Sequence, residues 1–268
     1  HLFGVKQANR HALVCQLRDT ISGSFPFEVV RTDITSFYES IDRRRLFESL
    51  DRDQLLSPSS RKYIKQILDS YSAISGSMLG IPRGVGISAY LAELYLKQVD
   101  EEIREIPGLV LYCRFVDDIV AVFARPPIGE DLGPFKDRVI DAIGKRGLAN
   151  NPAKTVAFNL ADAGAKKFEY LGYRFHLKKG QLKISPSAAK ILKYRSRMDA
   201  AFKEYRRENP VNPRGAFRKL VSRMRFLTGN TRLSNSKSQS ATGIYFSNSI
   251  ATELSSFELL DKRLKKRI

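Results

Sequence analysis

The stretch LVLYCRFVDDIVAVF, from Leu109 to Phe123, decides the fold of this chain. Two apolar, β-prone runs flank the polar pair Asp117-Asp118, a pattern that predicts a β-hairpin. Adjacent carboxylates between apolar strands repel each other unless a positive charge offsets them. A divalent cation does so, because Mg²⁺ prefers a few carboxylates together with substrate phosphates. Taken alone, the pair also fits an ordinary hairpin turn.

A second β-prone run, Val29 to Ile34, carries Asp33 near its end. A strand here can bring Asp33 to the same sheet edge as the hairpin turn. Three carboxylates at strand tips can hold two metal ions about 3.5–4 Å apart, the spacing of an in-line phosphoryl displacement. One ion would activate a 3′-hydroxyl and the other would steady the leaving pyrophosphate. As a single residue, Asp33 also fits a strand-end cap.

The flanking patterns predict a mixed α+β unit followed by basic helices. Helical spacing or turn signals predict helices around 42–50, 60–75, 87–103 and 132–148. Strands are expected around 154–158 and over 168–175. Beyond these, one basic helix is expected to start at Ser185-Pro186 and a second to end near Gly229. Tyr245 and Phe246 are expected in the core.

The charge is concentrated in the last third of the chain. Residues 1–170 hold 23 Lys+Arg against 22 Asp+Glu, whereas residues 171–268 hold 23 against 6. The whole chain has a net charge of +18, and nearly all of it comes from the second range. Such a basic region favours a polyanion, because neutralised phosphates release condensed counterions. Nucleic acid is the favoured partner and a membrane surface the second choice.

Composition and cysteine usage indicate a soluble, reduced, intracellular protein. Hydrophobic residues make up 43% and charged residues 28% of the chain, and no apolar run approaches 20 residues. Cys15 and Cys113 match no zinc or redox spacing. Because the chain opens on His1 and not on Met, we treat it as a fragment.

Five motifs, in order and spacing, resemble the palm motifs of reverse transcriptases. They are Asp33-Ile-Thr-Ser-Phe-Tyr38, Gly80-Ile-Pro-Arg-Gly84, Phe115-Val-Asp-Asp118, Asn151-Pro-Ala-Lys154 and Phe168-Glu-Tyr-Leu-Gly172. The resemblance implies an α+β right-hand palm, an antiparallel sheet packed on helices. It implies partial fingers over 1–28, a palm over 29–175 with a helical fingers-like insertion at about 43–80, and a basic helical thumb-like region over 176–268.

The resemblance also implies roles for single residues around the catalytic centre. The catalytic residues would be Asp33, Asp117, Asp118 and Lys154, with Lys154 protonating the pyrophosphate. Metal ligands would be Asp33, Ile34, Asp117 and Asp118, holding two Mg²⁺ ions that Mn²⁺ can replace. Tyr38 would stack under the nucleotide sugar and block a 2′-hydroxyl, which favours deoxynucleotides.

Further residues would bind the nucleotide and the nucleic acid. Pro82, Arg83 and Gly84 would shape the nucleotide pocket, with Arg83 standing where the family usually has Gln and able to grip a phosphate. Lys6 and Arg10 would clamp the triphosphate. The primer grip would be Tyr170, Leu171 and Gly172, and nucleic acid would contact Lys190, Lys193, Arg197, Arg218, Arg225 and Arg232. The basic run 262–267 fits either such a contact or an exposed tail.

The expected function is therefore a reverse transcriptase-type, RNA-directed DNA polymerase. The motif variants look most like bacterial antiphage defence enzymes of the abortive-infection type, some of which synthesise DNA without a template or from a protein side chain. Retron, group II intron and diversity-generating enzymes stay open, as do an RNA polymerase and a catalytically silent nucleic-acid-binding palm. Expected partners are RNA or DNA, dNTPs, a noncoding RNA or a defence protein, in a bacterial cytoplasm, with a homo-oligomer left open and no membrane.

Overall fold

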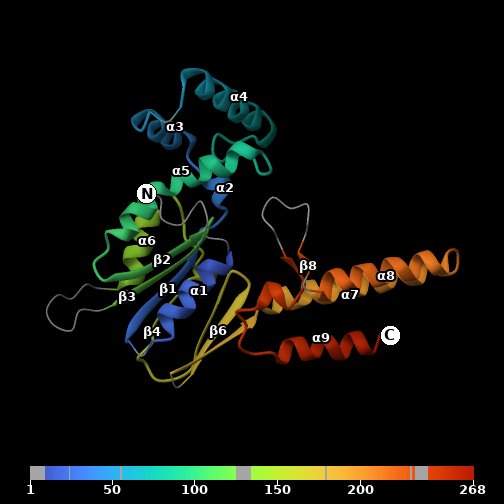
Figure 1. The fold of residues 1–268 in the computed structure, drawn as a ribbon. Helices are drawn as coiled ribbons and strands as arrows, with labels where there is room; N and C mark the ends of the chain where they lie inside the picture. The colour runs from blue at the N-terminus through green and yellow to red at the C-terminus, as the bar shows by residue number, and fades with distance from the viewer. Residues whose placement is uncertain are drawn as a thin grey trace. The chain divides into compact units, whose positions relative to one another are not determined.

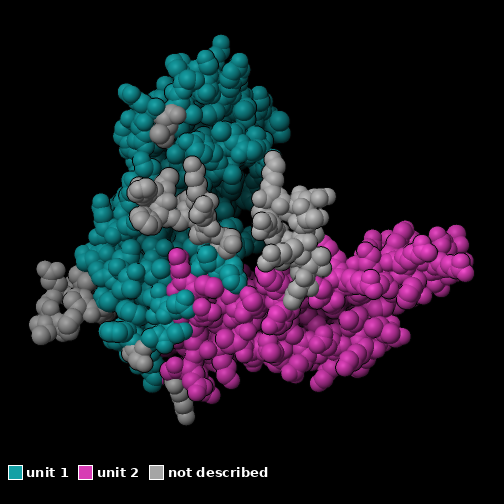
Figure 2. Space-filling model, viewed as in Figure 1, with its two compact units in different colours: residues 1–13, 19–163 teal, residues 14–18, 164–268 magenta. Residues whose placement is uncertain are grey.

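The computed structural model describes residues 10–23, 25–54, 56–124, 134–178, 180–229, 231–232 and 241–268. The chain divides into two compact units, one of residues 1–13 and 19–163 and one of residues 14–18 and 164–268 (Figure 2). The division after Ala163 falls inside the range 29–175 expected for the palm, and the three-region organisation stays a prediction. Among the described helices, none is long and apolar enough to cross a membrane.

A four-stranded antiparallel sheet lies at the centre of the first unit (Figure 1). Its strands are β1 (Phe27–Asp33), β2 (Leu109–Phe115), β3 (Asp118–Ala124) and β4 (Val156–Asn159), in the order β2-β3-β1-β4. The predicted hairpin is confirmed as β2 and β3. β1 lies between β3 and β4, and its β-branched Val29 and Val30 are fully buried, as suits a central strand.

Helices cover this sheet and extend from it. They are α1 (Arg10–Ile21), which contributes to both units, α2 (Phe37–Ser40), α3 (Arg43–Arg52), α4 (Pro58–Ser75), α5 (Gly86–Arg104) and α6 (Phe135–Lys145), with a 3₁₀ turn η1 at Pro152–Lys154. The predicted apolar stripe of α5, including Leu91 and Val99, packs with Phe123 of the sheet in one core. Phe135 of α6 stacks on Phe123 with ring centres 4.3 Å apart.

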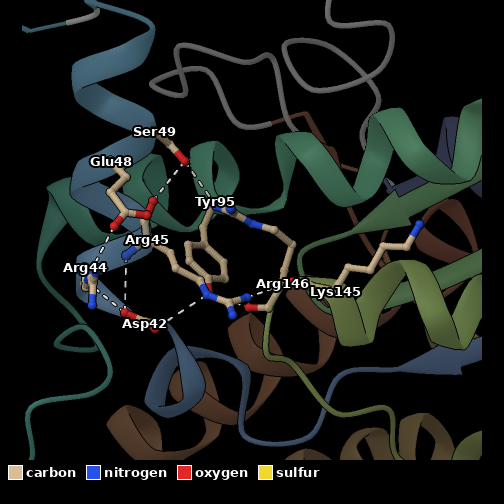
Figure 3. Close-up of polar contacts among 8 residues, drawn as sticks. All are labelled: Asp42, Arg44, Arg45, Glu48, Ser49, Tyr95, Lys145 and Arg146. Atoms are coloured by element: carbon tan, nitrogen blue, oxygen red, sulfur yellow. Dashed lines mark hydrogen bonds and ion pairs between the residues drawn. The ribbon is translucent and has the colours of Figure 1, made fainter.

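A buried arginine connects α3, α5 and α6 (Figure 3). The guanidinium of Arg146 lies 4.6 Å from the ring centre of Tyr95, and Tyr95 Oη donates a 2.6 Å hydrogen bond to the Arg146 carbonyl. From α3, Arg45 Nη1 donates to the Lys145 carbonyl at 2.7 Å, and Ser49 Oγ accepts from Arg146 Nη2 at 3.2 Å. These contacts attach α3 and α5 to the end of α6.

The second unit combines a small sheet with long helices. Its elements are β5 (Lys166–Tyr170), β6 (Tyr173–Lys178), β7 (Gln181–Pro186), α7 (Ala188–Glu208), α8 (Pro213–Thr228), β8 (Thr231–Arg232), β9 (Ala241–Thr242), η2 (Phe246–Asn248) and α9 (Ser255–Lys265). β5, β6 and β7 pair antiparallel. The apolar faces of α7, α8 and α9 meet around Tyr194, Met198, Leu227 and Leu260.

Three expectations for this unit are wrong. The single strand expected over 168–175 is two strands, because Leu171 (φ +48°) and Gly172 (φ +82°) form a turn. The helix expected from Ser185-Pro186 begins at Ala188, because Ser187 caps it by accepting from Lys190 N, while Pro186 ends β7. Tyr245 and Phe246 are 70% and 52% exposed and are not core residues.

Candidate active site

Strand pairing in the first unit brings the three expected carboxylates to one edge of the sheet. In the antiparallel register of β1 and β3, Asp33 is directly opposite Asp118. The pairing continues one step further, because Ile34 N donates to the Asp117 carbonyl at 3.1 Å. Directly opposite residues in such a pair have Cα atoms about 4.5–5.5 Å apart. Residues far apart in sequence therefore become neighbours.

Two of the carboxylates are paired with cations from neighbouring segments. Lys154 Nζ lies 2.6 Å from Asp33 Oδ2, and Arg31 Nη2 lies 3.0 Å from Asp118 Oδ1. Burial raises the pKa of Asp117, and the charge of Asp33 raises it further, while a backbone hydrogen bond and the charges of Lys154 and Arg83 oppose the shift. This edge of the sheet is thus a place where additional positive charge is stabilising.

The donor set fits a divalent metal by its chemistry. Carboxylate oxygens are the ligands that Mg²⁺ prefers, and Asp33, Asp117 and Asp118 supply such oxygens from adjoining strand ends. Across the part of the chain that the structure describes, no three His, Cys, Asp or Glu side chains are arranged as a metal cluster. Because Lys154 and Arg31 engage two of the carboxylates, a metal would have to compete with them for these oxygens.

The segment that carries Lys154 is attached to β1 by side-chain hydrogen bonds. Arg31 Nη1 donates to the Lys154 carbonyl at 2.8 Å, and the hydroxyls of Thr32 and Thr155 are 2.8 Å apart. Asn151 N donates to the Asp33 carbonyl at 2.7 Å. The backbone of Lys154 is therefore fixed beside the strand that ends in Asp33, which explains how the Lys154 side chain reaches that carboxylate.

A buried ion pair holds the hairpin turn against α5. Arg114 of β2 and Asp100 of α5 form a bidentate pair at 2.7 and 2.8 Å, with side chains 5% and 2% exposed. Glu93 accepts two further bonds from Arg114, at 2.8 and 3.2 Å. Arg114 Nη1 also donates at 3.1 Å to the carbonyl of Val116, whose φ of +59° is uncommon for a β-branched residue. The network supports the turn from which Asp117 extends.

Burial and the carboxylate partners together shift the pKa values of Arg114 and Tyr112. Burial acts to lower the pKa of Arg114, but the hydrogen bonds and charge of Asp100, with the hydrogen bonding of Glu93, outweigh it and raise that pKa. Burial and the charge of Asp100 raise the pKa of Tyr112, which donates a 2.6 Å hydrogen bond to Asp100 Oδ1. Arg114 and Tyr112 therefore keep their protons throughout the physiological pH range.

The expected nucleotide-pocket turn, Gly80 to Gly84, lies directly against α2. Gly80 N donates to the Ile41 carbonyl and Ile81 N to the Tyr38 carbonyl, both at 2.8 Å. Gly80 has φ +82°, and a Cβ on it would meet Glu39 Cα at 2.9 Å, so only glycine allows this approach. Pro82 continues the turn, and Gly84 shares the φ of +82° but faces open space.

Arg43, which is buried, supports the turn at Gly80 to Gly84. Arg43 donates to the carbonyls of Gly80 at 2.5 Å, Leu79 at 3.0 Å and Leu68 at 3.0 Å, and also to Ser72 Oγ. Burial lowers the pKa of Arg43. Three backbone carbonyls thus converge on one guanidinium, which fixes where the chain enters Gly80.

Three cations of the first unit were also expected to bind the nucleotide, namely Lys6, Arg10 and Arg83. Lys6 lies outside the described residues. Arg10 is exposed, and its guanidinium lies 4.6 Å from the ring centre of Phe115, two residues before Asp117. Arg83 forms a bidentate pair with Glu39 at 2.6 and 2.8 Å, and these hydrogen bonds lower the pKa of the Glu39 carboxyl.

In the second unit, the expected primer grip forms the β5–β6 turn. Tyr170 is buried, and the Gly172 carbonyl accepts from Ser187 N at 2.9 Å. Lys190 Nζ lies 3.8 Å from the ring centre of Tyr173. The expected nucleic-acid contacts with exposed side chains are Lys193, Arg197, Arg218 and Arg225. Arg232 lies in β8, and its side chain falls outside the described part of the structure.

Sequence reasoning missed the residues that position the site. Asp100 and Arg114 are single charges inside otherwise apolar patterns, one on the α5 stripe and one on β2. Opposite charges at such positions on neighbouring elements are a signal for a buried ion pair, because unpaired buried charges are costly. Arg31, which contacts Asp118, is likewise a charged residue within a largely buried strand, β1. Arg43 carries no comparable signal, since it opens an outwardly polar helix.

The first unit is thus an antiparallel sheet packed on helices, with Asp33, Asp117 and Asp118 at adjoining strand ends. The sequence model of the family described as reverse transcriptase (RNA-dependent DNA polymerase) matches residues 28–175. The chain belongs to this family. Among solved structures it is similar to apo telomerase from Candida tropicalis truncated from the C-terminal domain, with 18% identity and a TM-score of 0.46. That match covers 68% of this chain and 40% of the telomerase chain. No curated protein matches.

Asp100→Ala tests the support of the hairpin turn. Removing one partner leaves Arg114 buried with only Glu93 to pair it, so we expect the free energy of unfolding to fall by about 3–5 kcal/mol. Urea unfolding followed by circular dichroism measures this change. Glu48→Ala, which breaks an exposed pair with Arg44, serves as the control and should cost less than about 1 kcal/mol. Equal losses in both variants would contradict a supporting role for Asp100.

Proposed function

We propose that this chain is a DNA polymerase of the reverse transcriptase type that adds deoxynucleotides by a two-metal mechanism. The observation that carries the proposal is the β1–β3 register, which sets Asp33 opposite Asp118 with Asp117 in the adjoining turn. Family membership supports the reaction class. The Ile34 carbonyl would add a further oxygen ligand beside Asp33.

The residues at the sheet edge divide the chemistry between them. Bound Mg²⁺ ions would supply Lewis-acid activation of the 3′-hydroxyl and charge neutralisation of the triphosphate. Asp33, Asp117 and Asp118 would hold these ions. The Lys154 ammonium, which lies 2.6 Å from Asp33 Oδ2, would give a proton to the departing pyrophosphate oxygen when Asp33 serves as a metal ligand. Tyr38 would lie against the sugar of the incoming nucleotide.

The second unit would hold the nucleic acid. Residues 171–268 carry 23 basic against 6 acidic side chains. Several acidic side chains there are already paired within the unit, including Asp199 with Arg263 and Glu204 with Arg223. The exposed cations of α7 and α8, among them Lys193, Arg197 and Arg225, fit contacts to a phosphate backbone. The β5–β6 turn at Leu171-Gly172 would hold the primer end.

The biological setting that the motifs favour is bacterial antiphage defence. The motif Phe115-Val-Asp-Asp118, the segment Ser36-Phe-Tyr-Glu-Ser40 and the Pro82-Arg-Gly84 turn support this branch over retron, group II intron and diversity-generating enzymes. In that setting the primer is a 3′-hydroxyl or a protein side chain, and the cellular compartment is the bacterial cytoplasm. A catalytically silent palm is the alternative, and the complete aspartate trio favours the enzyme.

Asp117→Asn and Asp118→Asn test the catalytic assignment. Each substitution removes a charge that the metals require, so we expect dNTP incorporation with Mg²⁺ or Mn²⁺ to fall by about 10³-fold or more. Incorporation is measured on RNA, on DNA and without template, and nucleic-acid binding should persist in both variants. Asp69→Asn, an exposed carboxylate of α4, is the matched control and should keep wild-type incorporation. Wild-type rates in either test variant would overturn the proposal.

The binding role of the basic helices predicts a steep dependence on salt. Removing one cation that contacts a phosphate should lower the slope of log affinity against log salt by about 0.7–0.9. We therefore expect Lys193→Gln with Arg197→Gln to flatten the slope measured by fluorescence anisotropy with a labelled RNA–DNA hybrid. The exposed Arg44→Gln of α3 is the control. An unchanged slope in the double variant would remove these two residues from the interface.

A further inference from the structure

One feature without an assigned role is the ion pair between Arg83 and Glu39. It lies next to Tyr38, the residue expected to contact the nucleotide sugar. Arg83 Nε and Nη2 donate to the two carboxylate oxygens of Glu39, at 2.6 and 2.8 Å. The same guanidinium lies 5.4 Å from the ring centre of Tyr38. Glu39 thus anchors Arg83 in a position where it contacts the aromatic ring. The pair connects α2 with the turn at Gly80 to Gly84.

The ring of Tyr38 is also constrained by its other neighbours. Phe37, which is buried in the core, contacts it edge to face with ring centres 5.6 Å apart. The Tyr38 carbonyl accepts from Ile81 N, so its backbone is tied to the turn that carries Arg83. Tyr38 therefore meets a fixed aromatic ring and a bidentate-anchored guanidinium, which together limit the rotation of its side chain.

The pair joins α2, which follows β1 and Asp33 in the chain, to the turn at Gly80 to Gly84. Both carboxylate oxygens of Glu39 are engaged by Arg83, so the pair is fixed on both sides of this junction. The guanidinium fork of Arg83 is already occupied by Glu39. A phosphate would have to displace that carboxylate to gain the same bidentate geometry. This arrangement favours a role in shaping the pocket over a role as a phosphate ligand.

We propose that Glu39 and Arg83 are positioning residues that hold Tyr38 against the sugar of the incoming nucleotide and thereby set the discrimination between deoxyribose and ribose. The inference rests on the proposed polymerase function. The side chains of Arg83 and Glu39 are 67% and 46% exposed, and exposed ion pairs add little to folding stability. A merely structural role would therefore leave sugar discrimination unchanged, whereas a positioning role acts on discrimination and leaves stability unchanged.

The test compares dCTP with CTP in the wild type, in Glu39→Gln, in Arg83→Lys and in the swapped double variant Glu39→Arg with Arg83→Glu. Glu39→Gln removes the charge, and Arg83→Lys keeps the charge but loses the planar fork. We expect the dCTP-over-CTP ratio of kcat/KM to fall by about tenfold in each single variant and to recover in the swap, because directly contacting residues couple. The thermal midpoint should stay at the wild-type value.

Glu48→Gln, which removes the charge of an exposed pair on α3, is the matched control and should keep the wild-type ratio. The wild type, the two single variants, the swapped variant and the control are also titrated with dCTP and CTP by calorimetry. This measures nucleotide preference without incorporation. Ratios equal to wild type in both single variants, or a wild type without sugar preference in either assay, would overturn the positioning role.

The two proposals fail in distinguishable ways. A wild type that incorporates nucleotides while Glu39→Gln and Arg83→Lys keep its ratio overturns only the positioning role. A wild type that binds dCTP over CTP without incorporating either overturns only the polymerase, and the binding ratios then decide the role of the pair. A wild type that neither incorporates nor binds nucleotides overturns both.

Discussion

The buried pair between Arg114 and Asp100 is the interaction on which the rest of the site depends. A guanidinium with a side chain only 5% exposed is tolerated because two carboxylates and a carbonyl receive its hydrogen bonds. These bonds fix β2 on α5 and support the turn at Val116, where the backbone has a left-handed φ. That support fixes the backbone directly before Asp117.

Three carboxylates in and near the site are each paired with a cation. Asp33, Asp118 and Glu39 are each held by a cation from a different segment, namely Lys154, Arg31 and Arg83. Asp117 lies among them with a pKa raised by burial. Such a site is stable as it stands and yet provides carboxylates that a divalent ion can compete for. Under the proposed function, Lys154 would protonate the leaving group and Arg83 would hold the ring of Tyr38 in place.

The sequence predicted the elements that have strong local signals. The hairpin at 109–123, the amphipathic α5 and the strand that ends in Asp33 follow from apolar periodicity and polar breaks. The turn at Leu171-Gly172 was missed because apolar residues on both sides read as one continuous strand. The positioning residues were missed for a different reason: Asp100, Arg43 and Glu39 act through partners 14 to 44 positions away, and single-sequence patterns do not register such pairs. Charge placement in the second unit was predictable, whereas its exposed aromatic residues were not.

The most direct measurement is a crystal structure of the chain with Mn²⁺, a primer–template and an incoming deoxynucleotide, with the ions located by anomalous scattering. The account predicts manganese bound by Asp33, Asp117 and Asp118 at the edge of the four-stranded sheet, with the Lys154 ammonium displaced from Asp33. Manganese bound elsewhere, with the contact between Lys154 and Asp33 intact in the complex, would contradict it.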